Sequence, residues 1–190
     1  MPRRKTITDT AVLDGALRVM FRTSPSNFTL ADVADEVGIA SATLVQRFGS
    51  KRNLVIRAIE RDNAQFARTL IAAPATTGVE AVINLFLQLT PDLGVEDDSL
   101  ADQVLWLRED FRDPQLNSLA RERFRVLRSA VIARLPPLPV SGAVAARLLE
   151  AQWQGALNQW GFFKEGRLAE YVQRSLREWF ALTGAPGRNL

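Results

Sequence analysis

The sequence contains neither cysteine nor histidine among its 190 residues. Without cysteine there can be no disulfide bond and no thiolate ligand for a metal ion. Without histidine the chain lacks the side chain that most often serves as a general base, a metal ligand or a switch near neutral pH. We therefore expect no bound metal, no cofactor and no enzymatic activity.

Long apolar runs are also missing. Hydrophobic residues make up 47% of the chain, enough to build a core, but they occur in stretches too short to span a bilayer. The basic start, Met-Pro-Arg-Arg-Lys, is followed by no apolar stretch of the signal-peptide kind. The expectation is a folded cytoplasmic protein with no membrane partner.

Apolar residues recur at helical spacing almost throughout, and nothing has the alternation of a strand. This periodicity, with proline and glycine at the breaks, predicts an all-α fold of about nine helices. The expected helices cover residues 8–22, 29–37, 41–48, 51–71, 79–90, 99–110, 114–135, 141–165 and 167–183.

Positive charge is concentrated near the N-terminus. Residues 1–57 carry nine Lys and Arg against five Asp and Glu, whereas the rest of the chain carries 15 against 16. Such an excess is typical of a segment that meets a polyanion, although a basic solvated surface would have the same composition.

The stretch 28–48 has the pattern of a helix, a glycine-containing turn and a short second helix. Gly38 stands where a left-handed residue ends the first helix, Ala34 is small where two helices cross, and Leu44 faces inward. This is the layout of a helix-turn-helix, whose second helix enters the major groove of DNA. Short or polar side chains suited to reading base edges lie on the outward face of that helix: Ser41, Ala42, Thr43, Gln46 and Arg47.

Over residues 11–54 the sequence resembles the TetR family of repressors. The resemblance implies a DNA-binding head at residues 1–54 and an all-helical body at residues 55–190 that binds a ligand and dimerises through its last two long helices. The positions that carry the resemblance are Thr43, Leu44, Phe48, Ser50, Lys51 and Leu54.

Three positions depart from the family pattern. Val45 stands where the family usually has a Tyr that touches a phosphate, so one backbone contact is expected to be missing. Arg47 replaces a frequent His and is a candidate for an added phosphate or base contact. Ala40 replaces the usual capping residue, so the recognition helix is expected to start poorly ordered.

The resemblance also assigns phosphate contacts. Thr29, at a helix N-terminus, is expected to offer backbone N–H groups and a hydroxyl to a phosphate. Lys51 is expected to bind a phosphate from the start of the fourth helix. Arg3, Arg4 and Lys5 form either an arm that reaches a neighbouring minor groove or an ordinary basic tail.

The expected body mixes polar and aromatic side chains, as a pocket for an apolar or aromatic effector would require. Tryptophans on a helical stripe are equally consistent with a plain core. The candidate ligand-binding residues are Asn84, Gln103, Trp106, Trp153, Gln154 and Asn158.

The last two expected helices are rich in aromatic residues. Trp160, Trp179 and Phe180 are candidates, with Trp153, to cross a four-helix dimer bundle, and the alternative is that they fill an internal core. A symmetric dimer would read an inverted repeat with its recognition helices about 34 Å apart, or a multiple of that distance.

The sequence thus predicts a homodimeric repressor that a small molecule releases from double-stranded DNA. The alternative is a DNA-binding dimer whose body is structural or is controlled by a protein partner. An enzyme using acid pairs such as Asp97-Asp98 or Glu109-Asp110 would lack a partner base and a metal-ligand set. Because histidine is absent, operator affinity is expected to change little between about pH 6 and 8.

Overall fold

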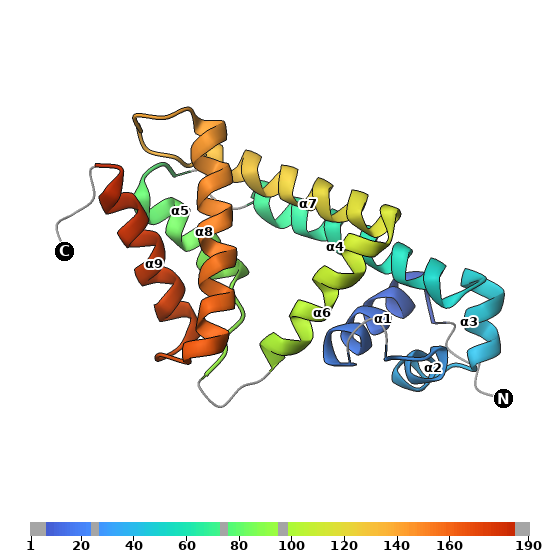
Figure 1. The fold of residues 1–190 in the computed structure, drawn as a ribbon. Helices are drawn as coiled ribbons and strands as arrows, with labels where there is room; N and C mark the ends of the chain where they lie inside the picture. Colours follow the sequence, from blue (N-terminus) through green and yellow to red (C-terminus); the bar gives the residue numbers. More distant parts are fainter. Residues whose placement is uncertain (1–6, 24–26, 73–75, 95–98, 185–190) are drawn as a thin grey trace. The chain divides into compact units, whose positions relative to one another are not determined.

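The computed structural model describes residues 7–23, 27–72, 76–94 and 99–184, apart from the side chains of residues 99 and 101–104. These residues form nine α-helices and no strand, which confirms the all-α prediction (Figure 1). The helices are α1 (Asp9–Thr23), α2 (Leu30–Val37), α3 (Ser41–Phe48), α4 (Lys51–Ala72), α5 (Val79–Leu89), α6 (Ser99–Arg112), α7 (Pro114–Ile132), α8 (Gly142–Phe163) and α9 (Leu168–Leu182).

The predicted helix ends lie within three residues of those in the structure. Local chemistry explains this agreement, since the breaks stand at residues that favour turns. Gly38 ends α2 in the left-handed conformation, with φ 71°, and its N–H donates to the carbonyls of Ala34 and Asp35. Within the described part of the chain, no helix combines the length and the hydrophobicity needed to cross a bilayer.

The chain divides into two compact units. The first, here called the head unit, comprises Met1–Phe66 and Ser99–Arg123, and the second, the body unit, comprises Ala67–Asp98 and Phe124–Leu190. The head unit therefore contains α6 and the start of α7 in addition to α1–α3 and most of α4. The functional boundary between residues 54 and 55 stays a prediction.

The core of the head unit is apolar and draws on every helix of the helix-turn-helix. Leu44 and Phe48 of α3 are 0% and 5% exposed, and Leu116 of α7 closes the same cluster. The other fully or almost fully buried members include Val12, Ala16, Val19 and Met20 of α1, Val33 and Ala34 of α2, and Leu54 and Ala58 of α4.

Helices α1 and α2 cross at very close range at Gly15. A Cβ atom at this position would lie only 2.2 Å from Cγ1 of Val37. Beside this crossing, Glu36 of α2 accepts hydrogen bonds from Arg18 at 2.8 Å and Arg22 at 3.1 Å on α1. Sequence reasoning identified Ala34 as the small residue of the head and missed Gly15.

The body unit is organised around α8 and α9. Trp160 is 0% exposed, and its indole N–H donates to the carbonyl of Gly166 at 3.0 Å. An ion pair joins α7 to α8, where the half-buried Arg128 donates to both carboxylate oxygens of the buried Glu150 at 2.7 and 3.0 Å. From α9 the residues Leu168, Val172, Leu176 and Phe180 are buried.

The close crossing at Gly15 yields a stability prediction. Gly15→Ala should lower the free energy of unfolding by about 1–3 kcal/mol, because the added methyl group overlaps Val37. Urea unfolding measures the change. Val37→Ala in the Gly15→Ala background should recover part of the loss, and equal losses with and without Val37→Ala would show that this contact is not the cause.

Candidate nucleic-acid interface

Helix α2 begins with a complete capping box. The Thr29 hydroxyl accepts from the Asp32 backbone N–H at 3.2 Å, while the Thr29 backbone N–H donates to the Asp32 carboxylate at 2.6 Å. The hydroxyl also donates to that carboxylate at 2.9 Å. Hydrogen bonds from the backbone and side chain of Thr29 lower the pKa of Asp32. An incoming phosphate at Thr29 would therefore meet an ionised carboxylate, and this contact stays a prediction.

Helix α3 begins at Ser41 without help from a side chain. Its N-cap residue, Ala40, makes no side-chain hydrogen bond, as the sequence predicts. The turn before it is tied back to α2 by the Ile39 N–H, which donates to the carbonyl of Ala34 at 3.0 Å. Leu44 and Phe48 then bury the inner side of the helix. The orientation of α3 thus depends on packing rather than on its cap.

The exposed side of α3 carries Ala42, Val45 and Gln46. Successive residues of a helix are about 100° apart, which brings these three positions together on one face. We call them the reading face. Ser41 and Thr43 are half-buried beside it. Sequence reasoning placed Ala42 and Gln46 here, and it gave Val45 only as the position of a missing phosphate contact.

Arg47 does not belong to the reading face. Its guanidinium group pairs with Asp9 at the start of α1 through an Nε contact of 2.7 Å, and it also donates to the carbonyl of Ile7 at 3.0 Å. Arg57 of α4 approaches the same carboxylate at 3.7 Å. Both guanidinium groups lie over the ring of Phe48, at 5.8 and 5.0 Å from its centre. The structure therefore commits Arg47 to contacts inside the head unit.

Lys51 lies at the N-terminus of α4, where the sequence predicts it, and is half-buried. Its ammonium group lies 4.2 Å from the centre of the Phe28 ring and donates a hydrogen bond to the Phe28 carbonyl. Burial lowers the pKa of Lys51, while the carboxylates of Asp32 and Glu109 act in the opposite direction. Phe28 thus holds the lysine at the helix end.

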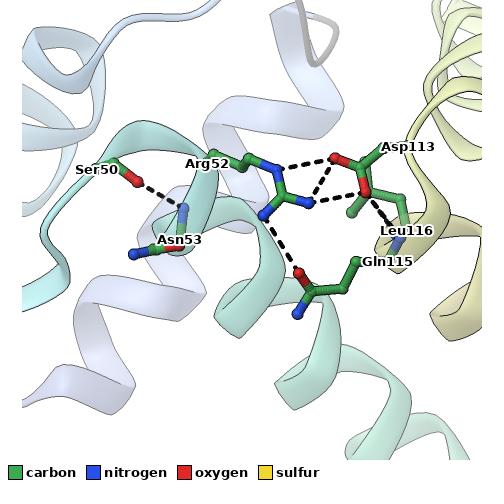
Figure 2. Close-up of polar contacts among 6 residues, drawn as sticks. All are labelled: Ser50, Arg52, Asn53, Asp113, Gln115 and Leu116. Carbon is green, nitrogen blue, oxygen red and sulfur yellow. Dashed lines mark hydrogen bonds and ion pairs between the residues drawn. The ribbon is translucent and has the colours of Figure 1, made fainter.

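The first turn of α4 is fastened to the first turn of α7, as Figure 2 shows. Arg52 donates to both carboxylate oxygens of Asp113, at 2.9 and 3.0 Å, and to the Gln115 amide oxygen at 3.2 Å. Asp113 also accepts from the backbone N–H groups of Gln115 and Leu116. Although burial raises the pKa of Asp113, these hydrogen bonds together lower it. Arg52 is therefore engaged in contacts inside the head unit, and the phosphate contact expected of Lys51 stays a prediction.

The chain has no histidine, but Asp110 of α6 has a pKa close to that of an ordinary histidine. Burial, assisted by the neighbouring carboxylate of Glu109, raises its pKa to about 6. Asp110 therefore titrates near the lower limit of the range from pH 6 to 8, over which the constancy of operator affinity stays a prediction. Among the described residues no group of three or more acidic side chains could hold a metal ion, and Asp97 and Asp98 lie outside those residues.

The predicted ligand residues are divided between the two units. Trp106 belongs to the head unit, where its ring lies 5.8 Å from that of Phe21, whereas Trp153 belongs to the body unit and donates to the Thr90 hydroxyl at 3.0 Å. In the body unit Asn84 and Asn158 are exposed and Gln154 is half-buried. The side chain of Gln103 lies outside the described residues, as do Arg3, Arg4 and Lys5.

Two of the three residues predicted at a dimer interface belong to the core. Trp160 is 0% and Phe180 2% exposed, so neither offers surface to a second protomer. Trp179 is half-buried, and its ring lies edge-on to that of Phe180 with 5.1 Å between the ring centres. The apolar side chains that α8 does expose are Val144, Leu148, Phe162 and Phe163.

The raised pKa of Asp110 predicts that the free energy of unfolding depends on pH. Its pKa is higher in the folded chain than the ordinary value of 3.8, so the folded state holds the proton more tightly. The free energy of unfolding should fall as pH rises from about 4 to about 6, by on the order of 1–2 kcal/mol, and this component should then stay constant.

Unfolding by urea at a series of pH values measures this component, which Asp110→Asn should remove. Asp35→Asn on the exposed side of α2 makes the same charge change and should leave it in place. An unchanged pH profile in Asp110→Asn would contradict the assignment.

Comparison with known proteins finds a family match for the helix-turn-helix segment. Residues 12–58, which hold the helix-turn-helix and the start of α4, match the model of the bacterial regulatory proteins, tetR family. A search of curated protein sequences found no match.

The fold beyond that segment is also shared with solved structures. A transcriptional regulator from Rhodococcus sp. Rha1 has a TM-score of 0.76 at 15% identity, covering 96% of this chain and 100% of that one. A regulator from Saccharomonospora viridis in complex with choline has a TM-score of 0.71 at 19% identity, and the match covers 91% of this chain and 95% of that one. The multidrug binding protein EbrR complexed with proflavin has a TM-score of 0.61 at 21% identity, and the match covers 88% of this chain and 96% of that one. In its head this chain is thus similar to the bacterial regulatory proteins of the tetR family, and its all-helical fold is shared with solved transcriptional regulators.

Proposed function

We propose that this protein is a DNA-binding transcriptional regulator that inserts α3 into the major groove, and that it acts as a homodimeric repressor on an inverted-repeat operator. The observation that carries the proposal is the coincidence of the family match at residues 12–58 with an exposed face on α3 and a lysine at the N-terminus of α4. The TetR family consists of regulators that are generally not enzymes.

Selection of DNA sites from a random pool by the purified protein tests this function. Enrichment of an inverted repeat, with half-site centres about one helical turn or a multiple of it apart, is the expected result. A pool that shows no enriched site after selection would contradict DNA recognition, and a single unrepeated half-site would contradict the dimer.

Lys51→Ala should weaken binding to every DNA sequence alike, because a phosphate contact carries no base information. The slope of the logarithm of affinity against the logarithm of salt concentration should fall by about one unit. Fluorescence anisotropy at several salt concentrations measures both. Arg147→Ala, which removes one positive charge from the exposed part of α8, should change neither. A loss confined to one operator would exclude the phosphate role.

For the dimer, the exposed apolar side chains of α8 are the best candidates in the described chain. Val144 and Leu148 are one turn apart, and Phe162 lies further along the helix with 86% of its surface exposed. Apolar groups of this size on one helix are typical of an interface. Leu148→Glu should yield a monomer in sedimentation velocity that no longer protects both half-sites, whereas an unchanged dimer would place the interface elsewhere.

A small apolar or aromatic effector is the second part of the proposal. It is supported by two proteins of the same fold, of which one was solved with choline and the other with proflavin. An effector releases DNA only if it binds one arrangement of the protein more tightly than another. The discriminating experiment is a compound screen read by thermal unfolding and by DNA release together. Stabilising compounds that never release DNA would favour a structural or partner-controlled body.

A further inference from the structure

Val45 is the largest exposed apolar side chain of the recognition helix. It is 47% exposed, while Leu44 and Phe48 fill the core side of α3 at 0% and 5%. The head therefore does not need Val45 for its packing. Its two methyl groups lie on the same face as Ala42 and Gln46, the face that the proposed function directs toward base edges.

The reading face carries no charge. The one charged residue of α3 is Arg47, and its guanidinium group is bound to the carboxylate of Asp9 and the carbonyl of Ile7. An arginine aimed into the major groove is the commonest reader of guanine, through O6 and N7. With Arg47 held at α1, the reading face is left with methyl groups and a single amide, and the hydroxyl groups of the half-buried Ser41 and Thr43 lie beside it.

These groups match particular features of the major groove. The 5-methyl group of thymine is the apolar group on a base edge there, and a glutamine amide pairs bidentately with N7 and N6 of adenine. We propose that Val45 is a specificity-determining residue, which packs against a thymine 5-methyl group beside the base contact of Gln46. Each half-site then contains an A·T pair at the position that Val45 faces.

This inference rests on the proposed function, and the experiment separates the two. The operator obtained by selection with the wild-type protein is resynthesised with deoxyuridine in place of one thymidine at a time. Deoxyuridine pairs like thymidine but lacks the 5-methyl group. At one thymine position per half-site the substitution should weaken wild-type binding about three- to fivefold, the factor expected for one buried methyl group.

Val45→Ala should bind the thymidine operator with an affinity lower by a similar factor. It should no longer distinguish deoxyuridine from thymidine at that position. Its response at other thymines should be unchanged, which shows that the head still docks normally. Val45→Thr, which keeps one methyl group and nearly the same shape, provides a second variant if the alanine protein is unstable. Val140→Ala, a valine of 42% exposure outside the head unit, should keep the full discrimination.

The outcomes are distinct. If the wild-type protein selects no site, the proposed function itself fails. If it selects a site in which deoxyuridine has no effect at any position, or in which the effect persists undiminished in both Val45 variants, DNA binding stands and the role of Val45 is overturned.

Discussion

Recognition helix α3 has eight residues and no side-chain cap, and a helix this short does not persist in water by itself. What the head can do on DNA therefore depends on how α3 is held. Leu44 and Phe48 anchor it from within, and Arg47 ties its last turn to Asp9 and to the carbonyl of Ile7. The same contacts that give α3 its position also decide which of its side chains remain exposed.

Helix α1 provides the support for this arrangement. Gly15 lets α2 approach to a distance that no larger residue permits, and Asp14 receives two hydrogen bonds from Arg61 of α4. Every described arginine of the N-terminal third pairs with a carboxylate of the head unit. The electrostatic contribution to DNA binding is then expected to come from a few positions such as Lys51, rather than from an evenly basic surface.

In the body unit, some apolar residues fill the core and others are exposed, and a sequence pattern does not distinguish the two. Trp160 and Phe180 fill the internal core, whereas Leu148 and Phe162 are exposed on α8. A helix that packs on an internal core and also on a second protomer has apolar residues on most of its sides. Periodicity alone does not tell which of these residues face the core and which face the partner. The proposed dimer consequently depends on side chains that differ from those first expected.

The sequence by itself determined the helices, their ends and the helix-turn-helix, because caps, turn glycines and apolar periodicity act between residues close along the chain. It also determined that Lys51 stands at a helix N-terminus. Only the tertiary structure decided that Arg47 turns to Asp9, which lies 38 residues away, and that Val45 takes its place on the exposed face. The burial that raises the pKa of Asp110 is likewise a property of the folded chain. Such pairings depend on how helices meet in space, and no local pattern records them.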